Sequence, residues 1–159
     1  MSELNNTEAK KEITAEEKQK SENYATCKAI AKELEQYYNG ELFKCEECGE
    51  IVKPTENENG GKVCSECGGV IDDGDQLNLY DYFNDDIYNI DYVINSDKTF
   101  KGVILMVACG GPNIYIDTFR QLVRLHWWGS YADFPIYHEI CDEIDAIFEE
   151  QYRIDFGLI

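Results

Sequence analysis

The chain has 159 residues, of which 43% are hydrophobic and 13% aromatic, so it can bury a core and is not largely disordered. Acidic residues outnumber basic ones by 32 to 14, and the formal net charge of −18 excludes a surface that binds nucleic-acid phosphates directly. The polar first residues and the lack of a long apolar run argue against a signal peptide and a membrane span, so we expect a cytoplasmic protein with reduced cysteines.

Residues 1–41 are expected to form an N-terminal helical segment, with roughly the first 13 residues flexible. Thr14 and Glu17 have the spacing of a capping box, which predicts a helix that begins near Ala15. Gly40 predicts its end, because glycine readily adopts the left-handed conformation that closes many helices. Between these points, apolar side chains at steps of three or four share one face: Tyr24, Cys27, Ile30, Leu34 and Tyr37. We interpret the segment as an amphipathic helix packed on the rest of the chain, with a partner-binding helix as the alternative.

Residues 42–71 contain two copies of one short motif. The first, over 43–49, is Phe-Lys-Cys-Glu-Glu-Cys-Gly, and the second, over 62–68, is Lys-Val-Cys-Ser-Glu-Cys-Gly. Each Cys-x-x-Cys-Gly predicts a tight knuckle whose glycine takes a positive φ while backbone amides turn toward the thiolates. Short strands are expected beside the knuckles at 51–52 and 70–71, with a polar loop over 54–61.

Four cysteines are expected to hold one structural Zn²⁺ ion: Cys45, Cys48, Cys64 and Cys67. Their two Cys-x-x-Cys pairs have the spacing of a zinc ribbon or knuckle, and zinc prefers four thiolates in a tetrahedron. A redox dithiol explains one pair but not two matched pairs, and an iron–sulfur cluster is a further alternative. Because four ligands leave no open coordination position, we expect a role in folding and not in catalysis. The remaining cysteines lie on apolar stretches and are interpreted as core thiols: Cys27, Cys109 and Cys141.

Residues 72–159 are expected to form the larger, acidic domain. A short helix is predicted over 76–83, a strand over 88–95, a turn over 95–98 and a central strand over 103–108. Residues 113–117 and 121–128 are typical of a hairpin, and Pro135 suits the first turn of a final helix that ends near residue 152. The buried face of that helix is marked by Ile136, Ile140, Ile144 and Ile147. The fold class is therefore α+β: an antiparallel sheet with a C-terminal helix packed on it, preceded by an N-terminal helix and the zinc module.

An acidic belt follows the second cysteine pair. Between Lys62 and Lys98 there is no Lys or Arg, but there are eight aspartates, Glu66 and several aromatic residues. Carboxylates pair with guanidinium groups and aromatic rings provide contact area, so this composition is typical of a surface that binds a basic protein. The expected contact residues are Asp81, Tyr82, Asp85, Asp86, Tyr88 and Asp91. The alternative is a solvated face that keeps the protein soluble. Calcium is disfavoured because residues 72–75 lack the ligand order of an EF-hand loop.

No catalytic motif is found in the sequence. There is no Gly-x-Ser-x-Gly, P-loop or dinucleotide fingerprint, and the histidines, His126 and His138, are expected on a strand and in the last helix. The Gly-Gly-Pro-Asn run at 110–113 is best explained as a tight turn at a strand end. We therefore expect a protein that is not an enzyme.

Three segments of the larger domain carry a resemblance to a known group of proteins. They are Cys109–Thr118 with Gly-Gly-Pro-Asn, Leu125–Gly129 with His-Trp-Trp, and Ala132–Pro135 ahead of an acidic helix. Over residues 77–152 the chain resembles small acidic proteins encoded on phages and conjugative elements of Gram-positive bacteria. With the cysteine-rich front half added, it is most similar to anti-CRISPR inhibitors of type II effector nucleases. That class has no shared catalytic motif, so the resemblance transfers no functional residue.

The charge and the resemblance lead to one functional hypothesis. An RNA-guided nuclease holds its heteroduplex in a positively charged channel, and an acidic protein docked on that surface blocks DNA loading or cleavage. The expected partner is a CRISPR effector nuclease, alone or with its guide RNA, with no direct binding of nucleic acid and no membrane. The alternatives are a DNA mimic that acts on a restriction enzyme, an enzyme that modifies a defence component, and an adaptor braced by the zinc module.

Overall fold

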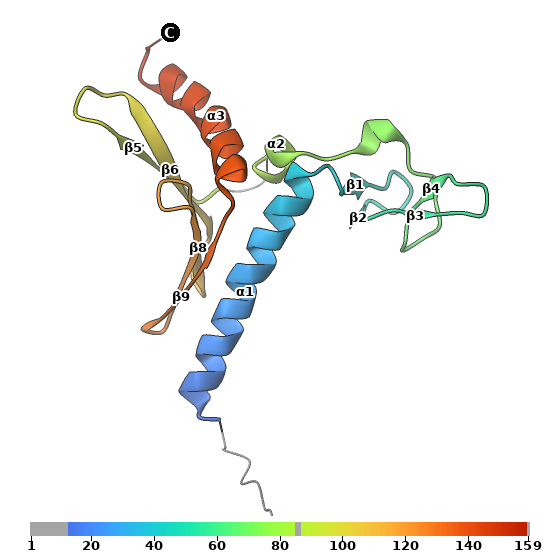
Figure 1. Ribbon diagram of the computed structural model, residues 1–159, viewed down its shortest axis with the longest axis horizontal. Coiled ribbons are helices and arrows are strands. Elements are labelled where there is room, and N and C mark those ends of the chain that lie inside the picture. The colour runs from blue at the N-terminus through green and yellow to red at the C-terminus, as the bar shows by residue number, and fades with distance from the viewer. Residues whose placement is uncertain (1–12, 85–86, 159) are drawn as a thin grey trace, which may run out of the picture.

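The computed structural model describes residues 13–84 and 87–158 (Figure 1). The elements in chain order are α1 (Ala15–Tyr38), β1 (Phe43–Lys44), β2 (Ile51–Val52), β3 (Thr55–Glu56), β4 (Lys62–Val63), the 3-10 helix η1 (Asp73–Asp75), α2 (Leu79–Tyr82), β5 (Asn89–Ile94), β6 (Phe100–Ala108), β7 (Asn113–Asp117), β8 (Leu122–Trp127), β9 (Ser130–Pro135) and α3 (His138–Asp155). Helices and antiparallel strands in this arrangement confirm the α+β class.

Helix α1 begins and ends where the sequence predicts. Thr14 Oγ1 accepts a hydrogen bond from the Glu17 amide at 3.2 Å, and the Glu17 carboxylate accepts one from the Thr14 amide at 2.9 Å. These two bonds complete the capping box. Gly40, with a φ of 65°, follows the last turn.

The predicted apolar face of α1 is largely buried. Cys27, Leu34 and Tyr37 belong to the core, and Ile30 packs against it. Tyr24 is 50% exposed, and its ring meets the edge of the Phe134 ring with centroids 5.6 Å apart. The amphipathic interpretation holds, with Tyr24 at the margin of the buried face.

Strands β5 to β9 form one antiparallel sheet in which each strand pairs with the next along the chain. The predicted turn after β5 is confirmed, because the Lys98 amide donates to Asn95 O at 2.9 Å. The predicted hairpin is formed by β7 and β8, which pair from Asn113 opposite His126 to Asp117 opposite Leu122. Strand β6 lies between β5 and β7, as its continuous apolar sequence indicates.

Strand β9 was not expected from the sequence, and the expectation that Pro135 opens a helix is wrong. Pro135 ends β9 opposite Leu122, and α3 begins only at His138. Trp128 and Gly129, with φ values of 47° and 74°, form the two-residue turn between β8 and β9. Asn-Gly is the usual sign of such a turn, so a Trp-Gly pair hides the hairpin from sequence inspection.

Two further elements differ in extent from the expectations. The helix predicted over 76–83 is only the single turn of α2, and η1 precedes it. Residues 70–71 do not form a strand, since Val70 makes only an isolated bridge to Val63, whereas the polar loop contains the short strand β3. Helix α2 begins only at Leu79 because the Asn78 side chain caps it, accepting a hydrogen bond from the Tyr80 amide at 2.8 Å.

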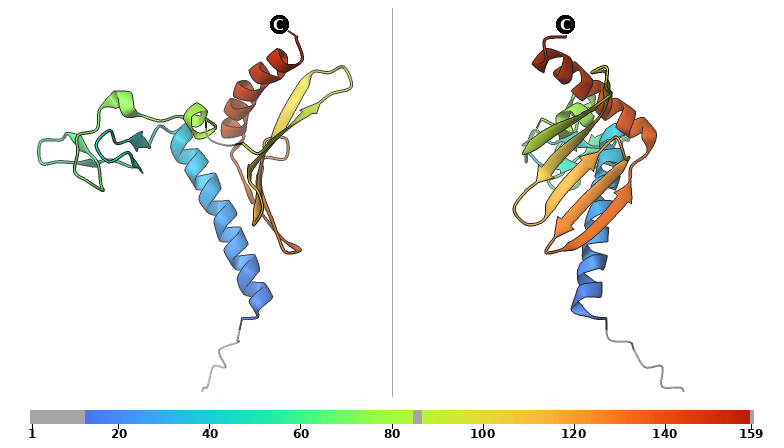
Figure 2. Two further views of the ribbon diagram at one scale, coloured as in Figure 1. Left: turned by 180° about the vertical axis from the view of Figure 1, so that it is seen from behind. Right: turned by 90° about the vertical axis from the view of Figure 1, so that its left-hand side faces the viewer.

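Both long helices lie on the same face of the sheet, and the helices that the structure describes leave its other face uncovered (Figure 2). Helix α1 crosses β8 and β9, and α3 packs on β6. The register aligns Leu105, Ile116 and Val123 across three strands, and these side chains are fully buried beneath the helices. Helix α1 and the sheet thus share one core, although the cysteine-rich segment separates them in sequence.

The cysteine-rich segment has a small core of its own and projects from the C-terminal end of α1, away from the sheet (Figure 1). Its connection to the main body includes a hydrogen bond from the Leu77 amide to Leu42 O at 2.8 Å. Gln76 Nε2 also donates to Gly40 O at 2.7 Å. The separate core consists of Phe43, Cys45, Val52, Cys64 and Ile71.

The Gly-Gly-Pro-Asn segment forms the tight bend between β6 and β7. The Gly110 amide donates to Asn113 Oδ1 at 2.9 Å. A Cβ atom at Gly111 would lie 2.3 Å from Trp127 Cζ3, so a side chain at this position collides with the indole ring. Two of the segments that carry the resemblance therefore pack on one another, and their joint role here is structural.

Candidate metal centre and acidic groove

The four predicted ligand cysteines converge in the small module. Their Sγ atoms all lie within 4.8 Å of one another, with 3.6 Å between Cys45 and Cys67 and 3.7 Å between Cys48 and Cys64. In a tetrahedral site with zinc–sulfur bonds of about 2.3 Å, neighbouring sulfurs are about 3.8 Å apart. The four thiols can therefore hold one metal ion, and they are the only such cluster of Cys, His, Asp or Glu in the described part of the chain.

The two knuckles have equivalent backbone geometry. The Gly49 amide donates to Cys45 O at 2.8 Å, and the Gly68 amide donates to Cys64 O at 2.9 Å. Both glycines have a positive φ, 77° and 78°, as the sequence predicts. The Gly69 amide points at Cys67 Sγ at 3.4 Å, which is the orientation that stabilises a thiolate.

The surroundings of the thiols influence their ionisation. A hydrogen bond from the Cys67 amide, opposed by burial and assisted by the Glu66 amide, lowers the pKa of the Cys64 thiol to about 7. The Glu50 amide acts to lower the pKa of Cys48, but burial and the three neighbouring thiols raise it to about 12. Because thiols this close share protons, a bound cation would displace those protons and take all four sulfurs as thiolates.

The remaining cysteines divide into two kinds. Cys27 and Cys141 are buried, and burial raises the pKa of their thiols to about 11 and about 12, so their interpretation as core thiols is confirmed. The same interpretation is wrong for Cys109, which is exposed because the chain leaves β6 at Ala108 and bends away.

A groove of about 470 Å³ lies between α2, β5 and α3. Tyr80 and Ile154 line it and remain 65% and 57% exposed. Glu150 and Asp155 contribute carboxylates, and none of the described residues that line the groove is basic. The remaining apolar lining consists of Phe83, Ile87, Ile90, Ile147 and Phe148.

The two carboxylates of the groove differ in whether they are free to pair with a cation of another molecule. Asp155 accepts hydrogen bonds from Tyr92 Oη at 3.0 Å and from Gln151 Nε2 at 2.6 Å. Burial, together with the bond to Asp155, raises the pKa of Tyr92 to about 12. Glu150 is exposed and has no ion-pair partner among the described residues, so it can pair with a cation from outside.

Two of the predicted contact residues have structural roles. Asp81 Oδ2 accepts the Asn78 amide at 2.8 Å and so closes the first turn of α2. Tyr82 packs with its ring edges against Tyr37 and Phe83, with centroids 5.2 Å and 4.9 Å apart. Most of the Tyr82 side chain therefore serves the core, and little of it remains for a partner.

Two further predicted contact residues, Tyr88 and Asp91, lie just before and within β5. Ile90 and Tyr92 point toward α3, so the alternation of a strand places Asp91 on the opposite face of the sheet. Tyr88 is 61% exposed ahead of β5. The acidic belt is contiguous in sequence, but the sheet divides the part of it that the structure describes. The last two predicted contact residues lie outside the described residues: Asp85 and Asp86.

Helix α3 carries acidic residues that the sequence reasoning did not select. Its one arginine, Arg153, pairs with Glu149 at 2.7 Å. The signal was present in the sequence, because most of these residues occupy the polar positions of the expected final helix, although Asp145 is half-buried. The acidic residues are Glu139, Asp142, Glu143, Asp145, Glu149, Glu150 and Asp155.

None of the helices that the structure describes combines the length and apolar composition needed to cross a membrane. No protein-family model matches the chain, and no curated protein or solved structure matches it either.

Proposed function

We propose that the cysteine cluster binds Zn²⁺ and that the ion stabilises the fold of the module. Thiolate ligands and near-tetrahedral spacing suit zinc, and four protein ligands leave no position for water or substrate. The small core supports this role, because two of its five residues are themselves ligands. Binding energies of roughly 10–16 kcal/mol, as measured for zinc peptides, would supply what so small a core lacks.

Metal analysis tests the identity of the ion. We expect one zinc per chain by elemental mass spectrometry, and loss of it in Cys45→Ser or Cys64→Ser. The control is Cys109→Ser, which removes an exposed thiol outside the cluster and should leave the zinc content unchanged. Iron with acid-labile sulfide and visible absorbance would instead indicate an iron–sulfur cluster.

We propose further that the protein acts by stoichiometric binding, with the acidic groove as its contact surface for a basic protein. The observation that supports this is that the groove combines apolar and acidic residues, with no basic residue among the described residues that line it. Exposed ion pairs contribute only about 0–1 kcal/mol each, so carboxylates alone give weak binding. Tyr80 and Ile154 add apolar area beside them, worth about 25 cal/mol for each Å² removed from water.

The partner we propose is a type II CRISPR effector nuclease, following the resemblance and the positively charged channel of such enzymes. The protein would then prevent target DNA from loading or being cleaved. The test is co-elution with the effector, with and without guide RNA, followed by a DNA-binding assay. Undiminished DNA loading and cleavage with excess protein would reject the proposal.

Two matched variants locate the contact surface. Glu150→Lys reverses a charge at the groove, and Asp91→Lys makes the same change on the other face of the sheet. We expect Glu150→Lys to weaken binding at least several-fold and Asp91→Lys to weaken it little. Equal effects of both variants would mean that only the net charge matters and not the groove.

The alternatives give different outcomes in the same experiments. A DNA mimic would inhibit a restriction enzyme and compete with short duplex DNA for it. An enzyme would inactivate its target at substoichiometric amounts, with the loss increasing over time. A one-to-one complex whose inhibition tracks occupancy supports the binding mechanism.

A further inference from the structure

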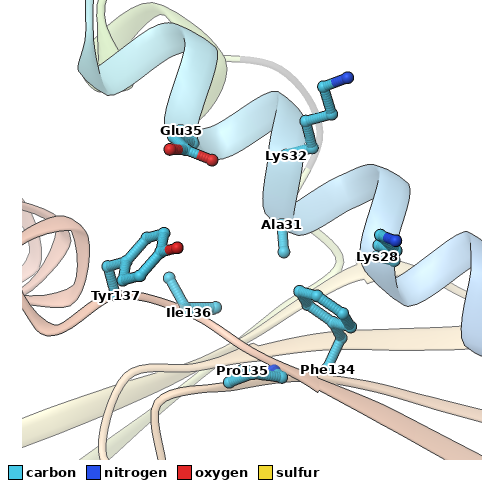
Figure 3. A pocket seen from close by; sticks show the side chains of 8 residues that line it. All are labelled: Lys28, Ala31, Lys32, Glu35, Phe134, Pro135, Ile136 and Tyr137. Carbon is cyan, nitrogen blue, oxygen red and sulfur yellow. The ribbon is translucent and has the colours of Figure 1, made fainter.

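A second hollow, of about 320 Å³, lies between α1 and the segment that joins β9 to α3 (Figure 3). It shares no lining residue with the acidic groove. Volumes near 300 Å³ are at the lower end of the range for small-molecule sites, and an apolar hollow with a few polar groups is the usual form of such a site.

The floor of the hollow is apolar, and contacts with neighbouring residues fix the positions of its side chains. Figure 3 shows Ala31, Phe134 and Ile136 facing one another across it. Ala31 and Ile136 are 7% and 5% exposed, and the Ile136 amide donates to Gln121 O at 2.8 Å. The Phe134 ring is fixed from the side by Tyr24. A flat or branched apolar group would therefore meet a preformed surface.

Two lysines flank this floor without an ion-pair partner. Lys28 and Lys32 lie one turn apart on α1, and no carboxylate of the described residues comes within ion-pair distance of either. Lys18 and Lys20, earlier on the same helix, pair with carboxylates at 3.9 Å and 2.7 Å. Glu41 interacts with Lys32 at longer range and Glu35 belongs to the same lining, so the positive charge of the hollow is centred on Lys28 and Lys32 and is partly offset by these carboxylates.

Lys28 and Lys32 both contribute atoms to the lining of the hollow. Figure 3 shows the Lys32 ammonium directed outward, but four rotatable bonds allow it to swing to a bound anion. Glu35 lies one turn further along α1, near the 66% exposed ring of Tyr137. The rim is therefore cationic at one end and anionic at the other.

We propose that this hollow binds a small organic monocarboxylate with an apolar, preferably aromatic, body. The ring lies on the floor between Ala31, Phe134 and Ile136, and the carboxylate pairs with Lys28 and Lys32. Glu35 orients the ligand, because it repels a carboxylate at the opposite end. The small volume favours a free small molecule over a protein segment, and charge complementarity selects the anion.

The test uses indole-3-acetate as the probe and indole-3-acetamide as its uncharged counterpart. In two-dimensional amide spectra of the full chain, we expect the acid to shift the signals of Ala31, Ile136 and Tyr137, with a Kd of about 0.1–1 mM. The double variant Lys28→Gln/Lys32→Gln should raise that Kd about fivefold and leave the weaker binding of the amide unchanged. The matched control, Lys18→Gln/Lys20→Gln, changes the same charge on the same helix and should leave the acid's affinity unchanged.

Three outcomes would overturn the proposal. One is the absence of shifts at millimolar indole-3-acetate, and another is equal binding of acid and amide. The third is tight binding of an acidic peptide together with no binding of indole-3-acetate, which would show that the hollow binds a protein partner. The experiment needs no effector nuclease, so its result is independent of the binding function proposed above.

Discussion

Trp127 and Trp128 are neighbours in sequence, but the first packs against the core and the second is exposed to solvent. Trp127 packs against the main core and against Gly111, whereas Trp128 is 88% exposed and has a φ of 47° that a bulky residue rarely adopts. The Trp128 ring meets the edge of the Trp127 ring, with centroids 5.8 Å apart. A residue in this position contributes little to stability, and Asn-Gly would suit the turn better.

We therefore expect Trp128→Asn to increase the free energy of unfolding by about 0.5 kcal/mol, because relief of the left-handed backbone exceeds the loss of one ring contact. Trp127→Ala should decrease it by about 2 kcal/mol, because it leaves a void beside Gly111. Urea unfolding followed by circular dichroism compares the two variants without depending on tryptophan fluorescence. Destabilisation of similar size in both would show that Trp128 also supports the core.

Asp145 is a half-buried carboxyl group on the inner side of α3. Burial, with smaller effects of Asp142 and Glu149, raises its pKa to about 6, even though Thr118 Oγ1 donates a hydrogen bond to it. Since its folded pKa lies above the usual 3.8, the folded state holds this proton more tightly than the unfolded chain does. The contribution of Asp145 to stability therefore falls as the pH rises from about 4 to about 6.

Asp145→Asn keeps an acceptor for Thr118 and removes this titration. We expect the variant to be more stable than the parent at pH 7.5 by up to about 1 kcal/mol, a figure reduced for the partial exposure of the carboxyl group. The advantage should shrink at pH 5. Urea unfolding at both pH values measures it, and Glu143→Gln, an exposed change on the same helix, serves as the control. An advantage that grows toward acid pH would contradict the assignment.

At the scale of elements, the sequence predicted structure best where a local rule dominates. The capping box fixed the start of α1, and the repeated Cys-x-x-Cys-Gly motif fixed both knuckles. Strand β9 was not predicted, because Trp128, with its positive φ, stands where an asparagine usually marks such a turn. Burial and alternation depend on tertiary packing, and they separate the described residues of the acidic belt: Tyr82 packs against the core and Asp91 faces the far side of the sheet. The acidic groove lies between α2, β5 and α3, and no local sequence pattern predicts that these three elements come together.

The cysteine module and the main body should respond differently to metal removal. The module has a core of five residues, whereas the main core spans α1, the sheet and α3. A strong chelator should therefore expose Lys44 and Lys62 to trypsin while most helical circular dichroism persists. Adding zinc back should restore resistance to cleavage. Unchanged cleavage after verified loss of the metal would show that the module folds without it.

At the scale of the whole molecule, the unbalanced charge acts against folding. The net charge of −18 repels itself more strongly in the compact state than in the expanded chain. Most ion pairs in the described part are exposed, including Lys20–Glu16 and Arg153–Glu149, so they return little energy. Binding of a basic partner of the kind proposed above would neutralise part of this repulsion.

This balance predicts that salt stabilises the free protein. Raising NaCl from about 10 mM to about 500 mM shortens the screening length from roughly 30 Å to under 10 Å, which weakens long-range repulsion more than contact ion pairs. We expect the free energy of unfolding to rise by about 1 kcal/mol, measured with urea at constant zinc because guanidinium is itself a salt. Asp142→Asn/Glu143→Gln, on the exposed face of α3, should stabilise the protein at low salt and have less effect at high salt. KCl should act like NaCl, since screening depends on ionic strength and not on the ion. Stability that falls with both salts would show that attractive ion pairs outweigh the net negative charge.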